Sequence, residues 1–228
     1  MGQFQSIRNV FLDAGGVILD EEDHERTHAE IISLLIRSVR PHYSPEQYWL
    51  DVEEAVTCFA PSVYNYVLWK NTGEVPLYNA LKAEHRTQFS NRRPALKPMN
   101  GLEKVVVNLA ARYRLGILGQ YRDELKTVLS GIGVLRYFSF QSTQDGHSFT
   151  KPDPRYFEQI LKEGEVVPSV SLMVGDRIDK DVIPAKMVGM MTVRLATGLH
   201  RNQHPRTPDE FPDAEVHQLE ELLDILHP

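Results

Sequence analysis

The sequence has little cysteine, no long apolar run and no excess of basic residues. Its single cysteine, Cys58, excludes a disulfide within the chain and is typical of a reducing compartment. No apolar run approaches the roughly 20 residues of a membrane span, and the first residues, MGQFQSIRN, lack the layout of a signal peptide. The net charge of -6 argues against a nucleic-acid-binding protein, which would carry a basic surface. We therefore predict a cytoplasmic protein without membrane or nucleic-acid partners, in which Cys58 is a small buried thiol.

Two parts of the chain differ in the spacing of their apolar residues. Between residues 20 and 93, four stretches repeat apolar side chains at helical spacing, with no strand pattern among them. The second stretch begins with Ser44, Pro45 and Gln47, which provide an N-cap, a first-turn proline and a capping-box partner. This region is predicted to be an all-helical insert.

Strand and helix patterns alternate in the rest of the chain. Short apolar runs followed by helical patterns favour an α/β fold with a parallel sheet wound on both faces. We predict an α/β core at residues 1–17 and 97–228 and a helical cap at residues 18–96. The predicted strands are the run that ends at Asp13 and residues 114–120, 138–143, 171–176 and 191–195; a last helix is predicted at residues 216–226.

Three aspartates stand at or just beyond the ends of predicted strands. Asp13 ends the first apolar run, Asp176 ends another, and Asp181 follows five residues later. Ligands of open α/β sheets bind beyond the carboxyl ends of the strands, so these side chains are expected to share one edge. Carboxylates held together repel unless a hard cation such as Mg²⁺ lies among them. The sequence predicts a magnesium site there, with Asp13 as the candidate nucleophile; the alternative for Asp179 or Asp181 is a helix cap.

A lysine and a strand end complete the candidate site. Lys151 directly precedes a proline-stiffened helix start, KPDP, so its ammonium is positioned to balance carboxylate charge and bind a phosphoryl oxygen. A solvated lysine is the ordinary alternative. The run ILGQ, residues 117–120, ends a strand, where backbone amides and Gln120 are candidates for binding an anion. Gly119 contributes no side chain.

Together these segments resemble a known family. FLDAGGVILD at 11–20, the strand ending at Gly119, KPDPRYF and VGDRIDKDVIPAKMVGM resemble the four ordered motifs of the haloacid dehalogenase-like hydrolase superfamily, in its helical-cap, phosphatase-type branch. The resemblance spans the whole chain. It implies a Rossmann-like sheet with an inserted cap, and Mg²⁺-dependent hydrolysis of phosphate esters through a phosphoaspartate.

The resemblance also implies a role for each motif residue. Asp13 is the nucleophile, Asp176 and Asp181 are acidic metal-site residues, and Lys151 steadies Asp13 and the phosphate. The metal site includes Asp13 and the backbone carbonyl of Gly15.

Two glycines depart from the family pattern. Gly15 stands where the phosphatases usually carry a second aspartate, a general acid whose loss lowers the rate by roughly 10²–10⁴. Gly119 stands where a Ser or Thr hydroxyl usually holds the phosphate, and losing such a donor costs a factor of about 10² or more. His24, just downstream, is the candidate substitute acid; the alternative is a solvated histidine on a charged helix.

The leading hypothesis is a Mg²⁺-dependent phosphatase acting on a small phosphorylated metabolite. A dehalogenase would also need an aspartate nucleophile, but it has no use for Mg²⁺. Gly15 and Gly119 motivate a catalytically silent binding protein instead, and a phospho-receiver module would lack the helical insert. The cap aromatics are candidates for a substrate roof or, alternatively, for the cap core: Tyr48, Trp49, Tyr64, Tyr66, Trp69 and Tyr78. The sequence names neither the substrate nor the oligomeric state.

Overall fold

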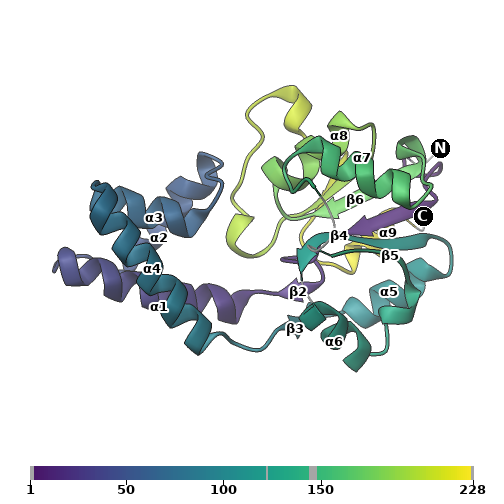
Figure 1. Ribbon diagram of the computed structural model, residues 1–228. Coiled ribbons are helices and arrows are strands. Elements are labelled where there is room, and N and C mark those ends of the chain that lie inside the picture. The colour runs from purple at the N-terminus through teal and green to yellow at the C-terminus, as the bar shows by residue number, and fades with distance from the viewer. Residues whose placement is uncertain (1–2, 122, 144–147, 227–228) are drawn as a thin grey trace. The chain divides into compact units, whose positions relative to one another are not determined.

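The computed structural model describes residues 3–121, 123–143 and 148–226, with side chains described except at residues 120, 121 and 141–143. The chain divides into two compact units: Met1–Asp20 with Leu96–Pro228, and Glu21–Ala95. We call them the core unit and the helical unit (Figure 1).

A six-stranded sheet lies at the centre of the core unit, and all of its strand pairs are parallel. The strand order β5-β4-β1-β6-β7-β8 places β1 in the interior of the sheet. The predicted parallel sheet is thereby confirmed. The strands are β1 (Asn9–Leu12), β4 (Arg114–Tyr121), β5 (Phe138–Thr143), β6 (Ser171–Gly175), β7 (Met191–Leu195) and β8 (Ala214–Val216).

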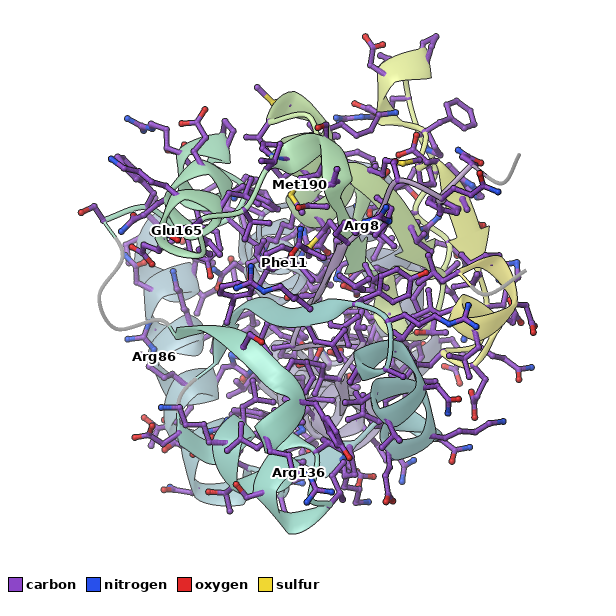
Figure 2. All side chains as sticks on the ribbon, turned by 90° about the vertical axis from the view of Figure 1, so that its right-hand side faces the viewer. Arg8, Phe11, Arg86, Arg136, Glu165 and Met190 are labelled. Atoms are coloured by element: carbon purple, nitrogen blue, oxygen red, sulfur yellow. The ribbon has the colours of Figure 1, made fainter. Side chains whose placement is uncertain are left out.

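Side chains of β1 alternate between the two faces of the sheet, and both faces are buried. Val10 and Leu12 join one apolar cluster, which includes residues of α5, α6 and α9. Phe11 joins the other cluster with Met190 and residues of α7 and α8 (Figure 2). A strand covered on both faces carries apolar residues in succession, which explains the continuous run VFL. The helices are α5 (Leu102–Ala110), α6 (Asp123–Gly131), α7 (Pro154–Glu163), α8 (Ile183–Met187) and α9 (Glu221–Leu226).

The boundary between the units differs from the prediction. The sequence predicts a cap from residue 18, but Ile18 and Leu19 are fully buried in the apolar cluster of the core unit. β2 (Leu19–Asp20) then pairs antiparallel with β3 (Lys97–Pro98). The chain therefore leaves the core unit and returns to it through two adjacent segments.

The predicted helix at residues 216–226 is wrong in its first part. β8 occupies Ala214–Val216 and pairs with β7, and α9 begins only at Glu221. A three-residue edge strand is too short to show the alternation by which strands are recognised.

The four predicted helices of the helical unit are present. Ser44 Oγ accepts a hydrogen bond from the Gln47 amide at 3.2 Å, as the N-cap prediction requires. Among the aromatic residues, Tyr48 is fully buried, whereas Trp49 and Trp69 are 47% and 45% exposed, so the cap-core interpretation does not extend to the tryptophans. The helices are α1 (Glu22–Val39), α2 (Pro45–Thr57), α3 (Val63–Thr72) and α4 (Val75–Arg92).

Cys58 directly follows α2 and is exposed, so the prediction of a buried thiol is wrong. The inward face of α2 is supplied by Val52, Ala55 and Val56, and the helix ends before the periodicity returns to that face. Across the described residues, no helix is both long enough and apolar enough to span a membrane.

Candidate active site

The site is built on the turn that follows β1. The Asp13 amide donates to the Val174 carbonyl of β6 at 2.9 Å, which fixes Asp13 beside the end of that strand. Gly16 closes the turn with φ +68°, and a Cβ there would lie 2.9 Å from Cγ of Asp176. Only glycine tolerates both that backbone conformation and that approach. The glycine therefore brings the turn of Asp13 against the carboxylate of Asp176.

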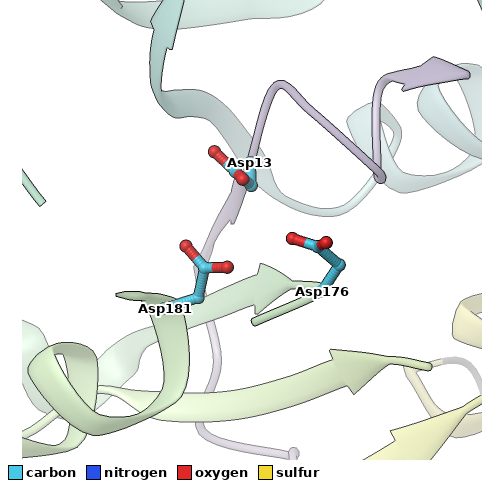
Figure 3. Close-up of side chains that lie close together, drawn as sticks. All are labelled: Asp13, Asp176 and Asp181. Carbon is cyan, nitrogen blue, oxygen red and sulfur yellow. The ribbon is translucent and has the colours of Figure 1, made fainter. Parts of the chain in front are cut away.

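Three carboxylates converge at this edge of the sheet, as Figure 3 shows. Oxygen atoms of Asp13, Asp176 and Asp181 all lie within 4.8 Å of one another. Asp176 and Asp181 are 7% and 1% exposed, and the side chain of Asp13 is 17% exposed. Asp13 is thus the member of the cluster most open to a ligand.

Lys151 contributes the positive charge of the site. Its Nζ donates to Oδ1 of Asp13 at 2.8 Å and to Oδ1 of Asp181 at 2.6 Å, and its side chain is 6% exposed. Three carboxylates against one ammonium leave these four side chains with two negative charges in excess. A divalent cation with a preference for oxygen ligands would balance this excess.

The ionisation of Lys151 and Asp181 follows from burial and from each other. Burial lowers the pKa of Lys151, but the charges of Asp13 and Asp181 outweigh it, so that pKa lies above its ordinary value. Burial raises the pKa of Asp181 to about 6; the Lys151 ammonium opposes the shift and the Asp13 carboxylate adds to it. The lysine is therefore protonated and Asp181 mostly ionised at neutral pH.

The turn after β6 is a π-helical turn, Ile178–Val182, which presents Asp181. The amides of Asp181 and Val182 both donate to the Arg177 carbonyl, and Oδ2 of Asp181 accepts from the Arg177 amide at 3.0 Å. Asp179 faces other partners, since it pairs with Arg177 at 2.6 Å and accepts from Gln203 at 2.8 Å. Asp181 belongs to the carboxylate cluster and Asp179 does not.

The strand end at Gly119 backs onto Asp13. A Cβ at Gly119 would lie 2.7 Å from Asp13 Oδ1 and 2.8 Å from the Ala14 amide nitrogen. The backbone of β4 therefore approaches Asp13 more closely than any side chain at position 119 would permit. Gln120 lies in β4, but its side chain is outside the described residues. Gly15 lies in the turn after Asp13, in a bridge with Leu19.

His24 is not the solvated histidine that the sequence suggested as the alternative. It lies in α1 of the helical unit, 8% exposed, with its ring centroid 5.8 Å from that of Phe89. Its role as a substitute acid stays a prediction.

Sequence reasoning missed three residues that contact the acidic turns. Arg194, Thr197 and Gln203 lie at the end of β7 or in the segment after it, which the sequence marks only as polar and proline-rich. Arg194 and Gln203 are 2% and 0% exposed. An arginine within an apolar strand, such as Arg194 in MTVRL, is a signal that can be recognised in the sequence. A glutamine in a loop, such as Gln203, gives no such signal.

Comparison with known proteins identifies the family of this chain. The model of the haloacid dehalogenase-like hydrolase family matches residues 7–189. The chain belongs to this family. Among curated relatives of this family member, the glyceraldehyde 3-phosphate phosphatase of Methanopyrus kandleri is 34% identical over 95 residues, which are 42% of this chain and 41% of the relative. The chain thus matches about two fifths of that relative's length.

Solved structures share the fold over nearly the whole chain. A HAD phosphatase from Thermococcus onnurineus has a TM-score of 0.60 at 23% identity, covering 97% of this chain and 98% of its own. A 2-haloacid dehalogenase from Pseudomonas syringae has a TM-score of 0.58 at 20% identity, covering 96% and 98%. Phosphatases and dehalogenases therefore share this fold, and the choice between them depends on the site.

Proposed function

We propose that the chain is a Mg²⁺-dependent phosphatase that acts on a small phosphorylated metabolite through a phosphoaspartate at Asp13. The observation that carries the proposal is the set of three carboxylates with one lysine and an excess of two negative charges. A dehalogenase has no need of such a set, because halide displacement requires no cation. The phosphatase activity named for the Methanopyrus relative supports the same choice.

The residues present fit Mg²⁺. The metal is hard and prefers oxygen ligands, with carboxylates supplemented by carbonyl, water or phosphate oxygens. Asp13, Asp176 and Asp181 would hold it, together with the Gly15 carbonyl. When bound, Mg²⁺ supplies charge neutralisation for the phosphoryl oxygens.

Asp13 and Lys151 have different roles in the proposed reaction. Lys151 holds Oδ1 of Asp13, and we assign attack on phosphorus to Oδ2. The Asp13 Oδ2–P bond forms as the ester P–O bond breaks, and Lys151 stabilises negative charge on the phosphoryl oxygens. Water then attacks phosphorus, which releases inorganic phosphate and restores the Asp13 carboxylate.

Gly15 shapes the substrate preference under this proposal. With glycine at this position, residue 15 supplies no proton to the departing oxygen. Esters with good leaving groups are least affected by the missing acid. We expect aryl and acyl phosphates to react faster than alkyl phosphates.

A catalytically silent binding protein is the second candidate, favoured by the glycines at positions 15 and 119. One assay separates the two. Purified protein with Mg²⁺ is given an aryl, an acyl and an alkyl phosphate, and released phosphate is measured for wild type, Asp13→Asn and Asp123→Asn. Asp123 is a matched control, because its side chain is 95% exposed on α6.

The hydrolase proposal expects turnover of the aryl and acyl phosphates that falls by roughly 10³-fold or more in Asp13→Asn, as for other nucleophile deletions. Asp123→Asn should retain wild-type rates, and chelation of Mg²⁺ should abolish turnover. Absence of Asp13-dependent turnover on all three substrates would favour the silent protein.

A further inference from the structure

The segment after β7, residues 196–203, contacts both turns that carry the carboxylates. Thr197 Oγ1 donates to the Gly16 carbonyl at 3.4 Å, in the turn after Asp13. Arg194, on β7, donates through Nε to the carbonyl of Asp176 at 3.3 Å. Arg194 and this segment therefore have contacts with the ends of β6 and β1, although they belong to none of the motifs that resemble the family.

Gln203 makes the most direct of these contacts. Its Oε1 accepts from the Ile178 amide at 2.6 Å, and its Nε2 donates to Oδ1 of Asp179 at 2.8 Å. Ile178 is the first residue of the π-helical turn, where a helix leaves backbone amides without an internal partner. A buried amide needs such a partner. Gln203, fully buried, thus caps the turn that presents Asp181 from a segment 25 residues away.

Arg194 in turn fixes the segment that carries Gln203. Its guanidinium donates to the carbonyls of His200 and Arg201 at 2.7 and 3.0 Å, and it pairs with Glu215 at 2.9 Å. The Gln203 amide donates to the same His200 carbonyl at 2.9 Å. A buried guanidinium with its donors satisfied in this way holds the backbone around it in one arrangement.

We propose that Gln203 is a positioning residue that sets the affinity of the acidic site for Mg²⁺, with Arg194 as its anchor. This inference rests on the proposed function. Carboxylates within 4.8 Å of one another repel, and without support the turn of Asp181 would relax away from Asp13 and Asp176. Gln203 opposes that relaxation, so that the cation meets ligands already in place.

The expected effect of losing Gln203 is a weaker metal site rather than a slower chemical step. Deleting a group that orients metal ligands typically weakens metal binding by about 10–100-fold. We expect Gln203→Ala to raise the dissociation constant for Mg²⁺ by about tenfold. Its kcat at saturating Mg²⁺ should stay within about threefold of wild type, since Gln203 does not contact the carboxylate cluster and the cation restores the geometry.

The test measures Mg²⁺ binding to the full chain by titration calorimetry and amide hydrogen exchange in the segment that contains Ile178. Both readouts are independent of turnover. Thr192→Val is the matched control: Thr192 lies fully buried on the same strand as Arg194, but its hydroxyl bonds to Asp213 at 2.9 Å. It should lower stability without changing Mg²⁺ affinity.

A rescue pair separates positioning from general stability. Gln203→Glu keeps an acceptor for the Ile178 amide but sets a carboxylate against Asp179, so Mg²⁺ binding should weaken. Adding Asp179→Asn supplies a donor opposite that carboxylate and should return the affinity toward that of wild type. Asp179→Asn alone completes the double-mutant cycle.

The outcomes are decisive in either direction. Wild-type Mg²⁺ affinity and wild-type exchange in Gln203→Ala would overturn the inference, as would a wild type that binds no Mg²⁺. If Gln203→Ala does not fold, the pair Gln203→Glu with and without Asp179→Asn decides, and absence of rescue overturns the inference. Failure of the proposed phosphatase is seen separately, as Mg²⁺ binding without Asp13-dependent turnover.

Discussion

Two buried clusters, one in each unit, differ in how they hold ionisable groups. In the core unit, Asp13, Asp181 and Lys151 are close together and charged, and the carboxylates exceed the cations. In the helical unit, His28 Nδ1 lies 2.8 Å from His85 Nε2, and the His28 ring stacks between Tyr64 and Phe89 at 3.9 and 3.7 Å. One cluster concentrates charge and the other excludes it.

The pKa values in the helical unit show the exclusion directly. Burial lowers the pKa of His28 to about 3, and His85 and His24 shift it in the same direction. Burial raises the pKa of Glu25 to about 7, although a hydrogen bond from Tyr64 opposes the shift. Among the described residues, the His, Cys, Asp and Glu side chains placed to share a metal ion are Asp13, Asp176 and Asp181 and include none of this cluster, so we assign the cluster to packing. The comparison teaches that burial alone does not mark a metal site, and that an excess of one charge does.

The largest effect that tests this difference is expected from Lys151→Met. The change leaves two buried carboxylates without their cation, which should cost about 3–5 kcal/mol of stability. Turnover should fall by about 10²-fold, because a charge that stabilises the phosphoryl group is lost. Mg²⁺ should raise the melting temperature more in this variant than in wild type, because the loss of the Lys151 ammonium makes the net charge of the site more negative by one.

Lys70→Met is the matched control in the helical unit. Lys70 also pairs with a buried carboxylate, Asp51, at 2.8 Å. Asp51 keeps hydrogen bonds from Tyr43 and Asn71, and Glu54, the other partner of Lys70, is exposed, so a single buried carboxylate remains with neutral donors. Melting curves with and without Mg²⁺ should show no specific gain for this variant. An equal gain in both variants would contradict the distinction between the two clusters.

A smaller effect is expected at Gly119, where the backbone of β4 lies close to Asp13. Gly119→Ser restores the residue type usual in the family, but its Cβ would lie 2.7 Å from Asp13 Oδ1. Asp13 or Ala14 must shift, and misplacement of a reacting group by about 1 Å costs up to 10²-fold in rate. We expect kcat/KM to fall by at least about tenfold. Gly131→Ala, at a position with nothing within 4 Å of the added Cβ, should match wild type; a gain in Gly119→Ser would show that the hydroxyl fits.

The charged cluster could be predicted from the sequence, because the strands that carry it are recognisable from local sequence patterns. Asp13 and Asp176 follow apolar runs, and the ends of parallel strands share an edge, so their meeting could be predicted before any contact was seen. The proline-rich helix start beside Lys151 was enough to predict that this lysine belongs to the site. The family resemblance added the roles, and the family itself is confirmed.

Contacts between distant segments were not predictable in this way. Gln203 sits in a loop, and nothing in its neighbours marks a bond to an amide 25 residues away. His24 and His28 are four residues apart on α1, a spacing that places both on one helix face, yet the polarity of His24 suggested exposure as the alternative to a catalytic role. Burial of these rings depends on Phe89 of α4, and pairing of distant helices leaves no local signature.

A further predicted effect concerns Glu25 and depends on pH. Its folded-state pKa of about 7 lies above the ordinary value of 4.5, so the folded chain binds this proton more tightly than the unfolded chain. Its contribution is fully present below pH 4.5 and is lost as the pH rises through 7. Glu25→Gln keeps a neutral side chain at every pH. The variant should therefore equal wild type near pH 4.5 and exceed its stability by up to about 3 kcal/mol at pH 8.

Urea unfolding followed by tryptophan fluorescence measures this difference, because both tryptophans of the chain, Trp49 and Trp69, lie in the helical unit. His28 contributes with the opposite sign, gaining stability as the pH rises from about 3 to 6.5, but it is common to both proteins and cancels in the comparison. Glu30→Gln, an exposed change on the same helix, should show no such pH dependence. A gain for Glu25→Gln that is as large at pH 4.5 as at pH 8 would mean that ionisation of the Glu25 carboxyl group is not what destabilises this cluster.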